Sequence, residues 1–284
     1  MSVIAYFGTG LLGSGFVRKM LERGETVHVW NRTIEKARAL EADGAKVFDT
    51  PADAARGAAE IHLTLSDDDA VDSVLEPLAS IILPTAFIAD HTTTAPTPTG
   101  ERVRRWTQRG RTFVHAPVFM GPQNARDATG LMLLAGDPAT RARVKPRLEP
   151  MTGKVLELGD DPTRPASFKL FGNLMLLVIA GGLADTYRLG RSLGIEPADA
   201  YTLFSEFNPG NAIGGRGKSM AEGKFTPPNF ELSMARKDLR LMIDEAARHG
   251  AKLDVVPAVA ALCDRYLAAG HGSEDVGVIA AAQP

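Results

Sequence analysis

The sequence predicts an α/β domain built on a doubly wound, largely parallel sheet, followed by an all-α domain. In residues 1–161 short apolar segments alternate with helical segments, which is typical of a parallel sheet covered by helices on both faces. In the second half the apolar residues recur at helical spacing, and no convincing strand follows. Residues 160–165, Asp-Asp-Pro-Thr-Arg-Pro, are dense in turn formers, so we predict a boundary there between a first domain at 1–161 and a second at 162–284.

The first predicted strand, residues 3–7, leads directly into a glycine-rich turn. Gly8, Gly10 and Gly13 fit the pattern G-x-G-x-x-G, and a helical pattern follows. The first glycine permits a tight turn, the second lets a ligand approach the backbone, and the third lets helix and strand pack closely. Because free N–H groups at a helix start bind phosphate, the motif predicts a site for a dinucleotide diphosphate. Its predicted contacts are Gly8, Thr9, Gly10, Leu11, Leu12 and Gly13.

The second predicted strand, residues 26–30, ends at Asn31, Arg32 and Thr33. A site for NAD usually carries Asp or Glu here, which binds both ribose hydroxyls. Asn31 has no charge to repel a 2′-phosphate, Arg32 can form a bidentate ion pair with it, and Thr33 can donate a hydroxyl. We therefore predict NADP(H) as the cofactor. Thr33 can also cap the helix predicted over residues 34–40.

Further short apolar segments predict the other strands of the first domain, at residues 46–48, 60–65, 86–89, 112–115, 132–135 and 154–158. In a sheet of this kind ligands lie outside the carboxyl ends of the strands. Three segments at the ends of predicted strands together mark one candidate site, at residues 65–67, 90–94 and 115–121.

A long apolar helix is predicted over residues 168–193. Its apolar residues cover more than one face, so we expect a helix buried in protein. Lys169 and Asp185 enclose only the uncharged residues 170–184, fewer than the ~20 that cross a bilayer, and we predict no membrane span. Lys169 and Asn173 lie four residues apart at the head of this helix and share a face. A polar pair at that place requires an explanation.

Composition argues against several classes of partner. A formal net charge of −2 predicts neither nucleic-acid nor membrane binding, and the basic run from Arg102 to Arg111 is expected to be a solvated helix face. The single cysteine, Cys263, lies in an apolar helical pattern and is expected in the core of a protein from a reducing compartment. No export signal is recognisable at the N-terminus, so we expect a cytoplasmic protein. No metal site is predicted.

Eight segments carry a resemblance to a known family. In order they are FGTGLLGSG, VWNRT, LTLSDDDAV, DHTTTAP, HAPVFMG, FKLFGN, FELSMARKDLRLM and GHGSEDVGVIA. The sequence resembles the β-hydroxyacid dehydrogenase family, and within it the glyoxylate/succinic semialdehyde reductases and 3-hydroxyisobutyrate dehydrogenases. The resemblance implies an N-terminal Rossmann domain, a helical C-terminal domain joined to it by one long helix, and a homodimer or homotetramer.

The resemblance also implies roles for individual residues. Lys169 matches the catalytic lysine, which hydrogen-bonds the substrate oxygen and donates the proton, and burial would lower its pKa. Asn173 matches the asparagine that orients the lysine and the substrate. Matches near the cofactor are Leu65, Ser66, Thr94 and Lys237, and matches that line the active site are Phe230 and Asp238. For Lys237 and Asp238 an exposed charged pair on an amphipathic helix is the simpler interpretation.

One segment departs from the family pattern, which is an acidic residue, any residue, and then Pro-Val-Ser-Gly. Here His115 stands at the acidic position, and Phe119 and Met120 replace Ser-Gly. In the family the serine hydroxyl and the following amides hold a substrate carboxylate, and these apolar side chains supply no hydroxyl. The large side chains of Phe119 and Met120 favour a bulkier or more apolar carbonyl compound or an imine as the substrate. The predicted substrate residues in this segment are Val118, Phe119, Met120 and Gly121.

The resemblance thus implies an NADPH-dependent oxidoreductase that transfers hydride between the nicotinamide and a small carbonyl compound or hydroxy acid, with Lys169 as proton donor. Semialdehydes and 2- or 3-oxo acids are the expected substrates. The alternative is an imine reductase of the same fold. Such enzymes commonly carry Asp or Tyr in place of the lysine, and Asp185 and Tyr187 lie about four to five turns further along the helix. A non-catalytic NADP-binding protein is a third interpretation, against which Lys169 argues.

Overall fold

The structure, a computed structural model, describes residues 2–282. Its contacts divide the chain into two compact units, Met1–Asn173 and Leu174–Pro284. The division falls inside the long helix α8 (Arg164–Ser192), which begins just beyond the boundary predicted after residue 161. Lys169 and Asn173 therefore belong to the first unit, and the boundary at 161–162 stays a prediction.

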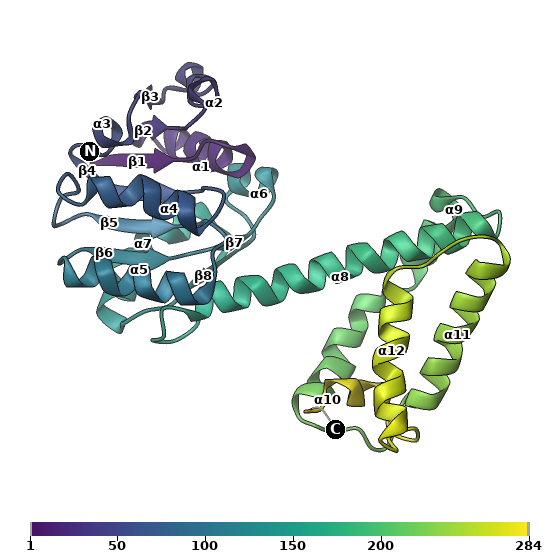
Figure 1. The fold of residues 1–284 in the computed structure, drawn as a ribbon. Helices are drawn as coiled ribbons and strands as arrows, with labels where there is room; N and C mark the ends of the chain where they lie inside the picture. Colours follow the sequence, from purple (N-terminus) through teal and green to yellow (C-terminus); the bar gives the residue numbers. More distant parts are fainter. Residues whose placement is uncertain (1, 283–284) are drawn as a thin grey trace. The chain divides into compact units, whose positions relative to one another are not determined.

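The first unit contains a six-stranded sheet of order β3-β2-β1-β4-β5-β6, in which every pairing is parallel (Figure 1). The strands are β1 (Val3–Phe7), β2 (Thr26–Trp30), β3 (Lys46–Val47), β4 (Ala58–Leu63), β5 (Phe87–Asp90) and β6 (Thr112–His115). The strand order reverses beside β1, which makes this a doubly wound Rossmann fold. The predicted fold class is confirmed.

The two last predicted strands, at 132–135 and 154–158, do not extend this sheet. They form β8 (Leu131–Leu134) and β9 (Lys154–Glu157) of a separate three-stranded sheet, in which β7 (Val118–Phe119) runs antiparallel to β8. The sequence analysis did not predict β7, because two residues are too few to show an alternating pattern. This short strand carries two of the predicted substrate residues.

Helices cover both faces of the parallel sheet. They are α1 (Leu11–Glu22), α2 (Ile34–Arg38), α3 (Pro51–Ala55), α4 (Asp68–Leu75), α5 (Pro96–Gln108), α6 (Pro122–Asp127) and α7 (Pro138–Leu148). Along β1, Ile4 and Tyr6 join the apolar layer that contains α1, α6 and α7, whereas Ala5 and Phe7 join the layer that contains α4 and α5 (Figure 1). Cover on both faces explains why the strands read as continuous apolar runs.

The basic run on α5 is not a purely solvated face. Arg102 is fully buried, and its guanidinium donates to Asp72 at 2.7 Å and to Asp68 at 3.0 Å, both on α4. Arg105 joins the same network through Asp72 and Glu76. The expectation from the sequence was wrong for Arg102, because the carboxylates that compensate its burial lie on another helix.

The second unit is all-α, as predicted. Besides the C-terminal part of α8 it contains α9 (Pro197–Glu206), a π-helix η5 (Ile213–Gly217), α10 (Lys218–Ala221), α11 (Leu232–Arg248) and α12 (Val255–Ala268). The packing of α11 and α12 buries Leu232, Cys263 and Tyr266. Cys263 is thus a core residue with a free thiol, as the sequence suggests.

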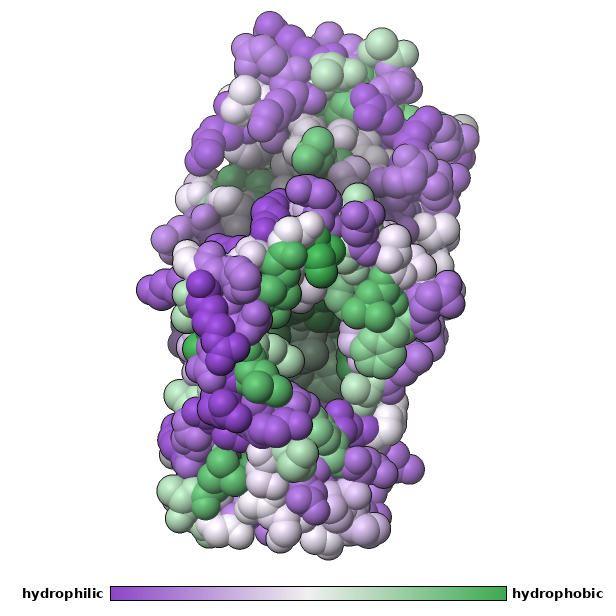
Figure 2. Space-filling view, turned by 90° about the vertical axis from the view of Figure 1, so that its right-hand side faces the viewer, coloured by the Kyte–Doolittle hydropathy of each residue, from purple (hydrophilic) through white to green (hydrophobic). Residues whose placement is uncertain are grey.

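The middle of α8 exposes its apolar side chains in the single chain. These large side chains are 41–73% exposed: Leu170, Phe171, Leu174, Met175, Leu176, Leu177, Val178 and Ile179. Further hydrophobic side chains gather on the surface viewed in Figure 2. Among residues 2–282, α8 alone is long and apolar enough to cross a membrane by length and composition. The predicted burial of this helix is therefore not provided by the chain itself.

Candidate active site

Three glycines shape the turn between β1 and α1 for different reasons. Gly8 has a φ of +92°, and a Cβ there would lie 2.1 Å from the backbone oxygen of Thr64. A Cβ at Gly13 would lie 2.0 Å from the backbone oxygen of Gly8, so only glycine lets α1 approach the loop this closely. A Cβ at Gly10 would meet nothing within 4 Å, and Gly10 lines the neighbouring pocket. These geometries match the three roles that the motif predicts.

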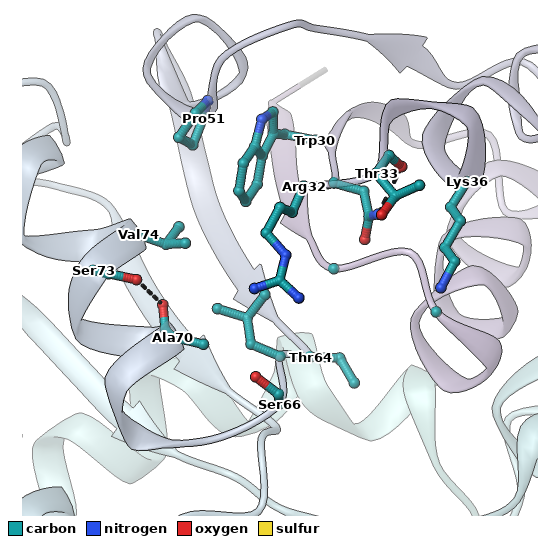
Figure 3. Close-up of a pocket in the computed structure, with 14 residues that line it drawn as sticks. Trp30, Arg32, Thr33, Lys36, Pro51, Thr64, Ser66, Ala70, Ser73 and Val74 are labelled. Carbon is teal, nitrogen blue, oxygen red and sulfur yellow. Dashed lines mark hydrogen bonds between the residues drawn. The ribbon is translucent and has the colours of Figure 1, made fainter.

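A pocket of about 620 Å³ lies beside this turn, at the carboxyl ends of β1, β2 and β4. Five residues predicted to bind the cofactor beyond the glycine turn line it, namely Asn31, Arg32, Thr33, Leu65 and Ser66. Figure 3 shows the Arg32 guanidinium pointing into the pocket, with Trp30 on one side of it and Lys36 on the other. The pocket therefore combines open backbone, two cations and an aromatic wall, which suits a dinucleotide with an additional phosphate.

The sequence analysis missed part of this lining, which comprises Trp30, Lys36, Pro51, Thr64, Ala70, Ser73 and Val74. Lys36 could have been predicted from the sequence, because it lies three residues after Thr33 in α2 and therefore near the same face of the helix. Most of the others come from α3 and α4, and only the tertiary fold brings them to the end of β2.

The Asn31 side chain links the glycine-rich turn to the end of β2 through two hydrogen bonds. Its side-chain oxygen accepts the backbone N–H of Thr9 at 3.0 Å, and its amide donates to the backbone oxygen of Thr33 at 2.8 Å. Thr33 is the N-cap residue of α2, yet its side chain makes no capping hydrogen bond. The proposed capping role of Thr33 is therefore absent, and its hydroxyl is available to a ligand.

In the loop after β5, the Thr94 side chain points into the protein interior. The Thr94 hydroxyl lies 2.8 Å from that of Thr99 and 3.0 Å from Nε2 of His115, and the side chain is buried. Burial lowers the pKa of His115, which keeps this imidazole neutral in the interior. Thr94 thus has internal partners, and the exposed side chain of this loop is Thr93. The place of Thr94 near the cofactor stays a prediction.

Leu65 connects the loops after β4 and β5. Its backbone N–H donates to the Thr92 hydroxyl at 3.0 Å. Ser66 follows on the rim of the pocket. Both residues therefore lie where the sequence analysis placed them, beyond the carboxyl end of a central strand.

Lys169 lies near the start of α8, half-buried beside β7. Its ammonium donates to the backbone oxygen of Val118 at 2.7 Å and lies 4.3 Å from the ring centre of Phe119. Burial lowers the pKa of Lys169, and within residues 2–282 no carboxylate forms an ion pair with it. A lysine held in this way can donate a proton near neutral pH. Asn173, one turn further along α8, is partly buried.

The remaining predicted substrate residues of the first unit, Met120 and Gly121, lie between β7 and α6. Gly121 is the N-cap residue of α6, and its backbone N–H donates to the side-chain oxygen of Asn124 at 2.8 Å. Met120 packs so closely on Gly130 that a Cβ there would lie 2.8 Å from its Cγ. The structure thus brings Val118 and Phe119 to Lys169, while the Gly121 amide is already occupied.

The predicted site residues of the second unit have their own partners. Lys237 forms an ion pair with Asp238 at 2.9 Å, and both side chains are about two-fifths exposed, with values of 43% and 40%. The backbone N–H of Phe230 donates to Asp275 at 3.1 Å. This geometry matches the simpler interpretation of Lys237 and Asp238, and their roles at the cofactor and substrate stay predictions.

Asp185 has a structural role. Its carboxylate is almost fully buried and accepts the backbone N–H groups of Asp254, Val255 and Val256, which begin α12, at 2.7–3.1 Å. Burial alone would raise the pKa of Asp185, but these N–H groups outweigh it and hold the pKa below its usual value. Asp185 is therefore an ionised helix cap and is poorly suited to donate a proton.

Comparison with known proteins agrees with this geometry. Residues 3–159 match the family model described as the NAD binding domain of 6-phosphogluconate dehydrogenase, and residues 166–282 match that described as NAD-binding of NADP-dependent 3-hydroxyisobutyrate dehydrogenase. The Bacillus subtilis protein named "Uncharacterized oxidoreductase YfjR" is 26% identical over 279 residues, which cover 96% of each chain.

Two further relatives are similar over almost their whole length. A probable 3-hydroxyisobutyrate dehydrogenase of Mycobacterium tuberculosis is 24% identical over 98% of this chain and 97% of its own. The structure of an imine reductase from Myxococcus stipitatus in complex with NADP+ superimposes with a TM-score of 0.91 at 18% identity, covering 98% of each chain, and this similarity supports the fold alone. From the matching models and the site geometry, the chain belongs to the β-hydroxyacid dehydrogenase family of NAD(P)-dependent oxidoreductases.

Proposed function

We propose that the protein is an NADPH-dependent reductase of small carbonyl compounds, with Lys169 as the proton donor. The observation that carries this proposal is the state of Lys169: a half-buried ammonium with a lowered pKa, held by one backbone oxygen and facing no carboxylate among residues 2–282. A cationic donor of this kind suits an oxygen that gains negative charge during reduction.

The preference for NADPH rests on the end of β2. Arg32 and Lys36 supply two cations to the pocket, Thr33 supplies a free hydroxyl, and Asn31 stands where an acidic side chain would repel a 2′-phosphate. The open backbone of Gly10 at the start of α1 would hold the diphosphate. The cofactor, when bound, supplies the hydride.

The chain's own residues would then manage the charge and the proton. The Lys169 ammonium donates a hydrogen bond to the substrate carbonyl oxygen, stabilises the negative charge that develops there, and transfers its proton to complete the hydroxyl. Burial favours this transfer because it destabilises the charged ammonium relative to the neutral amine. The Val118 oxygen fixes the position of Nζ before the substrate arrives.

An imine reductase is the alternative, and the apolar ring of Phe119 beside Lys169 is the observation in its favour. A C=N bond is reduced as its protonated, cationic form, which the Lys169 ammonium would repel. Of the two candidate acids further along α8, Asp185 is engaged as a helix cap, and Tyr187 lies about five turns beyond Lys169. We therefore place C=O reduction ahead of C=N reduction.

A screen of NADPH oxidation tests this order. The substrates are glyoxylate, succinic semialdehyde, a keto ester and a cyclic imine, each measured with the wild type, with Lys169→Ala and with Lys169→Arg. We expect turnover of at least one carbonyl compound that is lost in Lys169→Ala and partly kept in Lys169→Arg. Turnover of the cyclic imine alone, unaffected by Lys169→Ala, would contradict the proposal.

We also propose that a second copy of this chain covers α8, giving a homodimer in the cytoplasm. The exposed apolar side chains of α8 need a cover. The whole helix is long and apolar enough to cross a membrane, but its uncharged stretch, residues 170–184, is shorter than the ~20 residues of a bilayer span. Lys169 and Asp185, at the two ends of that stretch, both hydrogen-bond protein groups. Light scattering should give twice the chain mass without detergent, and a monomer that needs detergent would contradict a dimer.

A further inference from the structure

Phe119 occupies an unusually tight position against α8. A Cβ built on Gly172 would lie 2.2 Å from Cζ and 2.4 Å from Cε1 of the Phe119 ring. Contacts below about 3 Å do not occur between real atoms of this kind, so any side chain at position 172 would displace the ring. The ring can rest on the helix only because position 172 is glycine.

The same ring contacts the Lys169 ammonium. Nζ lies 4.3 Å from the ring centre, within the range of a cation–π interaction, and 2.7 Å from the Val118 oxygen of the preceding residue. Both contacts stabilise the charged form, and burial opposes it. The two residues of β7 thus hold the lysine from two directions. Two other aromatic side chains of α8, Phe168 and Phe171, contact each other with their rings tilted by 42°, and Arg164 lies over Phe168.

The adjoining turn lacks two of the groups that bind a carboxylate in the family, a hydroxyl at position 119 and a free N–H at position 121. The Gly121 N–H donates to Asn124, and the Met120 side chain packs on Gly130. Phe119 itself offers an apolar ring where a hydroxyl could have bound a carboxylate. A carboxylate placed beside the ring would lose its hydration without gaining a hydrogen bond from residues 119 and 121.

We propose that Phe119, seated on Gly172, is a positioning residue for Lys169 and restricts the substrate to carbonyl compounds whose neighbouring substituent is uncharged. The inference rests on the proposed function for its substrate class, whereas the contact between Phe119 and Lys169 stands without it. The ring orients the ammonium and occupies the place of a polar subsite. This arrangement also requires Gly172, because a side chain at that position would displace the Phe119 ring.

The first test is a titration of Lys169 in the free protein, by NMR of its ¹⁵N-labelled ammonium, with Lys169→Arg to assign the signal. Phe119→Leu keeps an apolar cover but removes the aromatic face, so the pKa of Lys169 should fall by about 0.5 to 1. Phe119→Ser opens the site to water and should raise it. Phe119→Trp should restore a value close to that of the wild type. An unchanged pKa in both Phe119→Leu and Phe119→Ser would overturn the positioning role.

The second test compares two glycines of the same helix. Gly172→Ala should displace the ring and lower kcat for an uncharged aldehyde about tenfold or more, while Gly182→Ala, where a Cβ would meet nothing within 4 Å, should leave it unchanged. Circular dichroism and light scattering establish that both variants are folded and equally assembled. The double variant Gly172→Ala/Phe119→Leu should have nearly the same kcat as Phe119→Leu alone, because replacing the ring already removes the clash with a side chain at position 172. Equal activity of the two glycine variants would contradict the inference.

The third test addresses the substrate class with a matched pair, succinic semialdehyde and its methyl ester. The wild type should favour the ester in kcat/KM by about tenfold or more, and Phe119→Ser should narrow that ratio. A preference for the acid would overturn the substrate restriction. Because the titration needs no substrate, turnover that is retained in Lys169→Ala would contradict the proposed function and leave the Phe119 contact to be judged by the pKa of Lys169.

Discussion

The two ionisable residues of α8 that border its apolar stretch, Lys169 and Asp185, differ in how their charge is compensated. Asp185 accepts hydrogen bonds from three backbone N–H groups, which lower its pKa. Lys169 has one backbone oxygen and an aromatic face, and burial lowers its pKa. A compensated charge of this kind stabilises a fold, whereas an undercompensated one can perform chemistry. We therefore expect a structural role for Asp185 and a chemical role for Lys169.

The largest effect should come from removing the undercompensated charge. Lys169→Ala should reduce kcat by about 10²- to 10⁴-fold, because proton donation and charge stabilisation act only in the transition state. The dissociation constant for NADPH, measured by fluorescence titration, should change less than about threefold. Equal losses in kcat and in NADPH binding would show that Lys169 supports the cofactor site instead.

The next effect concerns the cofactor. Arg32→Leu should weaken NADPH binding by about 10- to 100-fold and leave NADH binding nearly unchanged, because a charge-assisted contact with the 2′-phosphate is lost. Lys36→Leu should act in the same direction and more weakly. Isothermal titration with both cofactors measures the ratio, and parallel losses for the two would refute the assignment of the 2′-phosphate.

Asp185→Asn tests the compensated end of α8. The amide keeps the size of the carboxylate but removes its charge, so the start of α12 should lose about 1–3 kcal/mol of stability. Urea unfolding measures this loss, and kcat of the remaining folded protein should stay within about twofold of the wild type. A loss of kcat without a loss of stability would make Asp185 the proton donor and favour the imine reductase.

The pH dependence of the same variant gives a smaller effect with a defined sign. Because the folded-state pKa of Asp185 is lowered, its stabilisation is fully present above the unfolded-state pKa of about 4 and is lost as pH falls through the folded-state value. The stability difference between wild type and Asp185→Asn should thus be constant from about pH 5 upward and shrink below about pH 4. A difference that grows on acidification would contradict the capping role.

Local patterns predicted several residues that the structure brings together beside the glycine turn and the end of β2. The glycine turn and the end of β2 depend on neighbouring residues, so Gly8, Gly10, Gly13 and Arg32 could be placed from the sequence. Strand and helix alternation likewise predicted the fold class. Lys36 escaped notice although its spacing from Thr33 indicated it.

Features that depend on distant contacts could not be predicted in the same way. Arg102 is buried because α4 brings two carboxylates to it, and Thr94 turns inward because its hydroxyl forms hydrogen bonds with the Thr99 hydroxyl and with Nε2 of His115. The contact of Phe119 with Gly172 joins positions 53 residues apart. The apolar surface of α8 raises the same difficulty at a larger scale, because the packing of residues 2–282 leaves its large side chains exposed.

The pH dependence of hydride transfer tests the role of Lys169 most directly. Stopped-flow single turnovers with NADPH bound in advance follow the loss of nicotinamide absorbance from pH 6 to 11. In the wild type the rate should fall on the alkaline side with an apparent pKa below the usual lysine value of about 10.4, because the neutral amine has no proton to give. In Lys169→Ala the rate should be low and free of that transition. The same alkaline transition in both proteins would contradict proton donation by Lys169.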